Sequence, residues 1–201
     1  MLKYSVSALA LVVFSTACGK KEEEITTIDQ TTLQGTWTST CLVSGDKFEK
    51  KSSQFEDFTV VMTSTRYSDS ACTIEIDRLE GLATFLSESV DTTKSDMTPN
   101  SMEYTFETLT WTFVSDPSDA VDYAVACGST EERGVVDVLD KTCTISATLS
   151  KQFPVKAFGL LEIRDGALFM TDFDTNSATA DLRPTQYPSR TGLTLVPAAA
   201  E

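Results

Sequence analysis

The chain has 201 residues, of which 41% are hydrophobic, 9% aromatic and 23% charged. This length suits one folded domain, and the composition is too apolar for a chain that is disordered throughout. Thirty acidic against 16 basic residues give a formal net charge of −14, which repels nucleic-acid phosphates, so we expect no nucleic-acid partner. Histidine is absent, which excludes Ser-His-Asp and Cys-His nucleophile pairs and metal sites with histidine ligands.

The first 17 residues have the pattern of an export signal. Lys3 supplies a positive charge, an apolar run follows from Val6 to Phe14, and residues 15–17 are small or polar. This is the order of regions in a signal peptide, and the run is shorter than the roughly 20 residues that span a bilayer. We therefore predict a signal peptide over 1–17. The charged, Thr-rich residues 18–32 have no periodicity and are expected to form a flexible tether.

Residues 15–18, Ser-Thr-Ala-Cys, resemble the lipobox of bacterial lipoproteins, with Ser15 where that family usually has Leu. The resemblance implies that Cys18 is diacylated and becomes the new N-terminus, so that the membrane is a partner through this anchor. Gly19 is similar to the residue found in lipoproteins sent to the outer membrane, which implies that location. Acyl chains contribute about 0.8 kcal/mol per buried methylene, enough for a lasting anchor. The alternative is a secreted protein cut nearby that keeps a spare thiol at Cys18.

From Leu33 onward, runs rich in Thr, Val and aromatic residues alternate with clusters of Gly, Asp, Ser and Asn, which is typical of short strands and turns. Phe58, Val60 and Met62 alternate with polar neighbours and are expected on one inward face. Residues 117–126 could form one or two helical turns at most. The expected strands are 35–43, 55–64, 71–79, 82–89, 102–114, 133–139, 143–150, 156–164 and 167–173.

Two local signals within these runs predict backbone details. Inward positions change from even at Phe106 to odd at Leu109, which predicts a β-bulge near Thr108. Asp165 and Gly166 tolerate the positive φ of a type I′ turn, so strands 156–164 and 167–173 should form a hairpin. Together the strands predict an all-β fold with a single antiparallel barrel of about eight strands over 33–175, with a β-sandwich as the alternative. Residues 176–201 are expected to form an extended C-terminal tail.

Gly35 and Trp37 at the start of the first strand are similar to the opening motif of lipocalins and related calycin barrels. The resemblance implies that Trp37 closes one end of a barrel beneath an arginine, for which Arg183 is the nearest candidate and Arg190 the second. Residues 121–123, Val-Asp-Tyr, loosely resemble that family's second motif. The chain also resembles uncharacterised bacterial lipoproteins, on residues 35–37 and on Tyr-Ser-Asp-Ser at 67–70 ahead of a cysteine; this likeness carries no assigned activity.

Four cysteines remain once Cys18 is set aside, and they allow three disulfide connectivities. An exported protein meets an oxidising environment, and loop-closure cost favours near neighbours, which predicts Cys41–Cys72 and Cys127–Cys143. Each bond should add about 3 kcal/mol. The first pair requires a short or bent first strand that ends near Thr38. The cysteines lack the Cys-x-x-Cys spacing of zinc sites, so no metal is expected there.

Other candidate sites are set aside. Asp172, Asp174 and Asn176 have the spacing of a calcium loop, but Ser177 and Arg183 replace its required Gly and Glu, so an EF-hand is rejected. Three aspartates at 116, 119 and 122 are explained more simply by a solvated loop or helix face. No carboxylate pair and no Ser-x-x-Lys motif is singled out. We therefore expect neither an enzyme nor a cofactor.

An aromatic set remains, and core packing is its simpler explanation. Its functional explanation is the lining of a barrel cavity that holds one small apolar molecule or lipid. The expected function is thus an outer-membrane lipoprotein that binds such a ligand. The rival is a surface or periplasmic protein-interaction module with a filled core and an unidentified partner. The candidate lining residues are Trp37, Phe58, Tyr104, Phe106, Trp111 and Phe113.

Overall fold

The computed structural model describes residues 30–89, 100–146, 149–164, 166–170 and 193–196. The predicted signal peptide, Cys18, the rejected calcium loop and the two candidate arginines lie outside these ranges. The helices in the described ranges are α1 (Gln30–Leu33) and α2 (Pro117–Cys127). The strands are β1 (Gly35–Thr38), β2 (Leu42–Ser44), β3 (Lys47–Glu56), β4 (Thr59–Tyr67), β5 (Glu75–Ser89), β6 (Asn100–Phe113), β7 (Glu131–Glu132), β8 (Val135–Asp137), β9 (Lys141–Ser146), β10 (Leu149–Phe153), β11 (Lys156–Arg164), β12 (Ala167–Met170) and β13 (Leu193–Val196).

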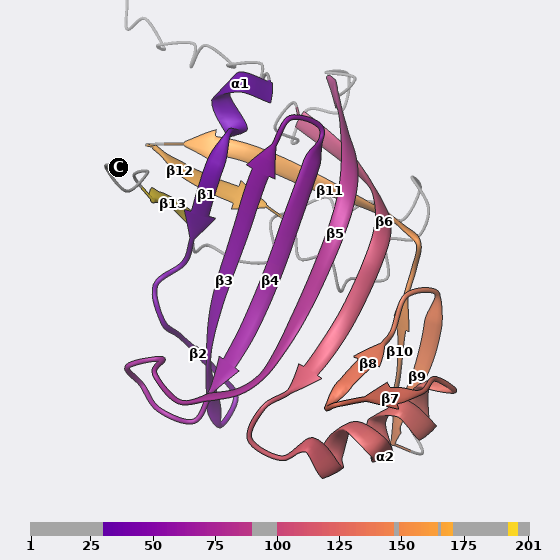
Figure 1. The fold of residues 1–201 in the computed structure, drawn as a ribbon. Helices are drawn as coiled ribbons and strands as arrows, with labels where there is room; N and C mark the ends of the chain where they lie inside the picture. Colours follow the sequence, from indigo (N-terminus) through magenta and orange to yellow (C-terminus); the bar gives the residue numbers. More distant parts are fainter. Residues whose placement is uncertain (1–29, 90–99, 147–148, 165, 171–192, 197–201) are drawn as a thin grey trace, which may run out of the picture.

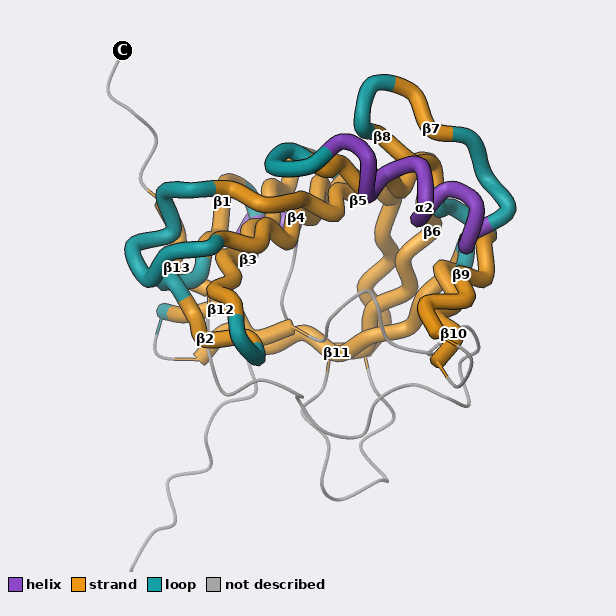
Figure 2. Tube along the Cα trace, turned by 90° about the horizontal axis from the view of Figure 1, so that it is seen from below, coloured by secondary structure: helices purple, strands orange, loops and turns teal. Residues whose placement is uncertain are grey.

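Hydrogen bonds join eight strands into a ring, which confirms the all-β, antiparallel expectation. Its order is β1, β3, β4, β5, β6, β11, β12, β13 and back to β1, and every neighbouring pair is antiparallel (Figures 1 and 2). The ring is not an even barrel. The β5–β6 ladder runs from Asp77 to Ser89, whereas the β12–β13 ladder joins only Ala167 and Leu168 to their partners.

Strand β11 forms the corner of the ring. Its first half, 156–160, pairs with β6, and its second half, 161–164, pairs with β12. Strands β7 to β10 and α2 are inserted between β6 and β11. They gather at the end of the large strands that lies away from α1 (Figure 1). Strand β8 extends the sheet beside β6, and β9 with β10 forms a separate hairpin.

The predicted strand 55–64 is wrong, because a tight turn divides it. Strand β3 ends at Glu56, Asp57 adopts a φ of +50°, and β4 begins at Thr59. The sequence pattern missed β3 because most of its residues are charged or polar. Phe58, expected on the inward face, lies in the turn and is 59% exposed. Predicted strands 71–79 and 82–89 are one continuous strand, β5, and predicted strand 143–150 spans two, β9 and β10.

Other local predictions are confirmed. In the β5–β6 ladder Leu82 pairs with Thr108 and Ala83 with Phe106, which leaves Glu107 as the extra residue of a bulge. Strands β11 and β12 form the expected hairpin, with Gly166 at a φ of +76°; Asp165 lies outside the described ranges.

Helix α2 is longer than the one or two turns expected, because Asp116 caps its first turn and Gly128, at a φ of +59°, ends it.

Both predicted disulfides are present, Cys41–Cys72 and Cys127–Cys143. The first strand does end at Thr38, as the first pair required. The unpredicted strand β3 runs between β1 and β4 in the ring. The β1–β2 connection, which holds Cys41, and the β4–β5 connection, which holds Cys72, therefore lie at the same end of the sheet (Figure 1). The second bond joins the end of α2 to β9. Two disulfides indicate an extracytoplasmic protein, since the cytoplasm keeps thiols reduced.

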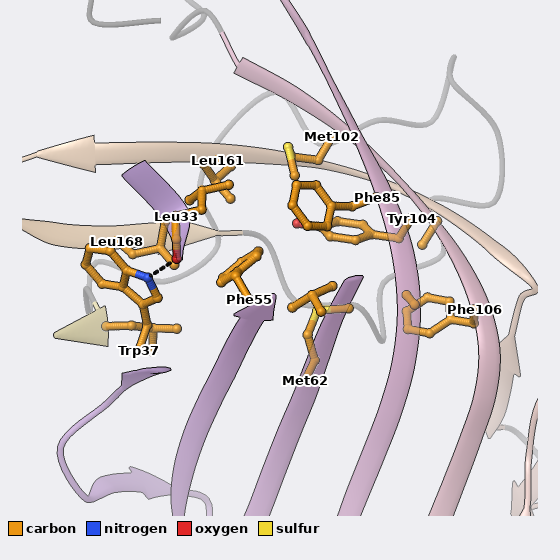
Figure 3. Packing of buried hydrophobic residues seen from close by; sticks show 14 residues of the cluster. Leu33, Trp37, Phe55, Met62, Phe85, Met102, Tyr104, Phe106, Leu161 and Leu168 are labelled. Atoms are coloured by element: carbon orange, nitrogen blue, oxygen red, sulfur yellow. Dashed lines mark hydrogen bonds between the residues drawn. The ribbon is translucent and has the colours of Figure 1, made fainter. Parts of the chain in front are cut away.

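The end of the ring near α1 is filled by packed side chains. Phe55, Phe85, Tyr104 and Met102 lie together between the strands (Figure 3), and the Phe55 and Phe85 rings meet edge to face at 5.4 Å. Trp37 is 4% exposed, and its Nε1 donates to the Leu33 carbonyl oxygen at 2.8 Å. The buried members of this cluster are Leu33, Trp37, Phe55, Val60, Met62, Ala83, Phe85, Met102, Tyr104, Phe106, Ala157, Leu161, Leu168 and Leu193.

Candidate functional site

The inner face of strands β3 to β6 changes chemistry along its length. Near α1, one cross-strand row is apolar: Phe55, Val60, Ala83 and Phe106. Strand alternation puts every second residue on the same face, so the rows at the opposite end also point inward. One of these rows contains Glu49, Arg66, Asp77 and Phe113, and the next contains Lys51, Ser64, Leu79 and Trp111.

Charged groups of these rows pair across the strands. Arg66 Nε donates to Asp77 Oδ1 at 2.7 Å, and Arg66 Nη2 donates to Asp77 Oδ2. The Asp77 side chain is 3% exposed, whereas that of Arg66 is 42% exposed and reaches solvent. The hydrogen bonds to Asp77 raise the pKa of Arg66 further above its ordinary value, so the guanidinium stays charged. Beside this pair, Ser64 Oγ donates to Glu49 Oε1 at 2.5 Å.

Aromatic rings from three elements pack against this end. The Trp111 ring on β6 lies 4.9 Å from that of Tyr123 on α2 and 6.1 Å from that of Phe153 on β10, measured between centroids. Two cations lie against the same indole: the Arg66 guanidinium carbon is 5.5 Å from its centroid, and Lys151 Nζ is 5.6 Å from it. These distances are within the range of cation–π attraction.

We call this group the charged–aromatic cluster. It combines a floor from β3 to β6 with side chains from α2 and β10, which the insertion between β6 and β11 supplies. Its members are Glu49, Lys51, Ser64, Arg66, Asp77, Trp111, Phe113, Tyr123, Lys151 and Phe153.

Two buried polar atoms of the cluster have no hydrogen-bond partner among the residues that the structure describes: Trp111 Nε1 and Tyr123 Oη. Burial raises the pKa of Tyr123 to about 12, so the phenol keeps its proton at neutral pH. Both atoms can therefore donate a hydrogen bond for which no acceptor is present among the described residues. An unsatisfied buried donor costs about 1–3 kcal/mol of stability.

The predicted lining residues do not form one site. Trp37, Tyr104 and Phe106 belong to the packed core near α1, whereas Trp111 and Phe113 belong to the charged–aromatic cluster. Phe58 belongs to neither. Sequence reasoning missed the polar members of the cluster because they are charged residues in strands, which the pattern of apolar alternation ignores. The available signal was the position of Arg66: it lies an even number of residues after the apolar Val60 and Met62 and so shares their face of the strand.

The three aspartates at 116, 119 and 122 lie at the start of α2 and on its exposed surface. Asp116 accepts a hydrogen bond from the Ser118 amide at the start of α2, and the exposed Asp119 and Asp122 follow on the helix. Within the described ranges, no three Cys, Asp or Glu residues are placed to hold a metal ion. None of the helices in those ranges is long and apolar enough to cross a membrane.

Comparison with known proteins gives no family: no family model matches the chain, and no curated protein matches it significantly. A fold alone does not identify an activity.

Proposed function

We propose that the protein is an exported, non-enzymatic binding protein, anchored to the outer membrane through Cys18. It holds a small, largely apolar ligand against the charged–aromatic cluster. The two disulfides support export, because such bonds persist in oxidising compartments. The antiparallel ring, with its eight strands in chain order, supports a lipocalin-like character for the ring.

The observation that carries the proposal is the change of chemistry along the inner face. The core cluster fills the ring near α1, and at the other end partly buried aromatic rings stand beside charged groups. Trp111 Nε1 and Tyr123 Oη are buried there without acceptors in the described part of the chain. A ligand that lies on these rings would gain about 25 cal/mol per Å² of buried apolar surface, before ordering costs are subtracted.

The binding proposal is tested with the full-length, detergent-extracted protein. Native mass spectrometry looks for a co-purified small molecule, and titration with the neutral probe N-phenyl-1-naphthylamine measures affinity. We expect binding that Trp111→Ala weakens about tenfold, because its ring supplies the contact surface. Phe58→Ala is the matched control, since it removes an exposed ring outside the cluster. Absence of both a co-purified species and probe binding would overturn the proposal.

The anchor is tested separately. Cells are grown with an alkyne-tagged fatty acid, and the mature protein is examined by mass spectrometry and membrane fractionation. We expect label on Cys18 of the wild-type chain and its loss, with release from the membrane, in Cys18→Ser. A mature wild-type protein with an unmodified Cys18 thiol would remove the anchor from the proposal.

A protein-interaction module is the second candidate. It is favoured by the filled core near α1 and by Val121 and Val125, which are 51% and 77% exposed on the outer side of α2. Such a module needs no interior ligand. Consistent absence of any bound species, together with unchanged probe fluorescence in wild type and Trp111→Ala, would favour this candidate.

A further inference from the structure

We propose that the ligand is an organic anion: a flat apolar body carrying an acidic oxygen group, such as a carboxylate or sulfonate. The acidic group would accept hydrogen bonds from Trp111 Nε1 and Tyr123 Oη beside the cations of Arg66 and Lys151. This inference rests on the proposed function and names the ligand class for the same cluster.

The two unsatisfied atoms are both hydrogen-bond donors. An indole N–H can only donate, and a phenol that keeps its proton at neutral pH donates readily. Both atoms are buried with no partner in the ranges that the structure describes, and the centroids of their rings lie 4.9 Å apart. A ligand that supplies acceptor oxygens would satisfy them, whereas a ligand that carries only donors or only apolar groups would leave them unsatisfied.

The groups of the cluster that attract a cation already have cationic partners within the chain. The Trp111 ring has Arg66 at 5.5 Å and Lys151 at 5.6 Å, and Lys151 also lies 5.1 Å from the Phe153 centroid. The carboxylate of Asp77 is neutralised by two hydrogen bonds from Arg66. A cationic ligand would meet these two like charges beside a carboxylate that is already paired.

Arg66 is both oriented by Asp77 and open to solvent. Its Nε and Nη2 are held by Asp77, which fixes the plane of the guanidinium and leaves Nη1 outside that pair. The side chain is 42% exposed, so an incoming anion can reach it. A guanidinium that is already oriented loses little conformational freedom when it binds an oxyanion.

The test compares two probes that share one ring system. 1-Anilinonaphthalene-8-sulfonate carries an anionic group, and N-phenyl-1-naphthylamine has the same rings without it. We expect full-length protein to bind the sulfonate probe about tenfold more tightly at low salt, because the oxyanion satisfies the donors and faces two cations. The advantage should shrink as salt is added, since partly exposed charges are screened.

Two variants assign the preference to the cluster. Tyr123→Phe keeps the ring and removes the O–H, and Lys151→Met keeps most of the side-chain length and removes the charge. Each should weaken the sulfonate probe about fivefold while affinity for the neutral probe stays within about twofold. Lys156→Met is the matched control: it removes one positive charge from an exposed side chain of β11 that pairs with Glu103 outside the cluster. It should leave both affinities unchanged.

The outcomes separate this inference from the proposed function. Equal affinity for the two probes, or a sulfonate affinity that Tyr123→Phe and Lys151→Met leave unchanged, would overturn the anion class while apolar binding stood. Failure of both probes to bind, in protein whose thermal unfolding is cooperative, would overturn the proposed function itself.

Discussion

Asp77 is a buried carboxylate whose only countercharge within hydrogen-bond distance, among the described residues, is a partly exposed arginine. Asp77→Asn would break the bidentate pair and leave Arg66 to be solvated by water. Because Arg66 already reaches solvent, we expect the free energy of unfolding to fall by about 1–2 kcal/mol rather than by the larger penalty of a fully buried pair. Urea unfolding measures this change.

The matched control for Asp77→Asn is Glu103→Gln. Glu103 pairs with Lys156 at 2.6 Å, but the Lys156 side chain is 56% exposed. A solvent-exposed ion pair contributes little, so this variant should cost less than about 0.5 kcal/mol. Equal losses in the two variants would contradict the structural role assigned to the Arg66–Asp77 pair.

Gly81 allows two core side chains to rest on the inner face of β5. A Cβ built at this position would lie 3.0 Å from both Leu109 Cδ1 and Phe106 Cε1. Gly81→Val should therefore overpack the core and lower the free energy of unfolding by about 1–3 kcal/mol. In the double variant with Leu109→Ala the loss should be smaller than the sum of the single losses, because removal of the Leu109 side chain leaves room for the new valine. Additive losses in a urea double-mutant cycle would argue against the close approach.

The connection between β4 and β5 is organised by one carboxylate. Asp69 accepts hydrogen bonds from the Ile74 amide at 2.7 Å, the Thr73 amide at 2.9 Å and the Thr73 hydroxyl at 2.8 Å. These bonds, that from Ile74 first, lower the pKa of Asp69 below its ordinary value of 3.8. The disulfide at Cys72 lies within the same connection.

This connection should give the protein a specific acid sensitivity. A carboxylate whose pKa is lower in the folded than in the unfolded state stabilises the fold at pH values above the unfolded pKa. This stabilisation is lost as the pH falls through the folded pKa. Wild type should thus be more stable than Asp69→Asn at pH 6, and the difference should shrink below pH 3.8. Urea unfolding of both proteins between pH 6 and pH 2 measures it; a difference that stays constant with pH would contradict the assignment.

At the scale of the whole molecule, each disulfide links two segments that no strand pairing joins. Cys41–Cys72 closes a sequence separation of 31 residues and Cys127–Cys143 one of 16. Replacing either pair by serine should lower the free energy of unfolding by about 3–4 kcal/mol, because the unfolded chain regains the entropy of the open loop. Urea unfolding of the two double-serine variants tests this, and losses below about 1 kcal/mol would show that the bonds do little for stability.

The fold class and several details could be predicted from the sequence because local rules decide them. The period-2 alternation identified most strands, the parity change at Phe106 and Leu109 located the bulge, and Asp165–Gly166 indicated the hairpin. The four cysteines that remain once Cys18 is set aside and the cost of loop closure together predicted both disulfides. Each of these signals depends on residues close together in the chain or on simple counting.

Only the tertiary structure decided where β3 lies, how the ring closes and which side chains form the cluster. Strand β3 carries charged residues on its inward positions, so it has no apolar alternation to reveal it. Lys151 contacts Trp111 although it lies 40 positions later in the chain, and Tyr123 contacts the same ring from a helix; no local pattern encodes either contact. Burial of a charge in a strand is tolerated only when a partner from another strand meets it. The sequence by itself therefore determined an all-β chain with two disulfides, because local alternation and cysteine spacing encode them, and only the assembled sheet brought the side chains of the charged–aromatic cluster together.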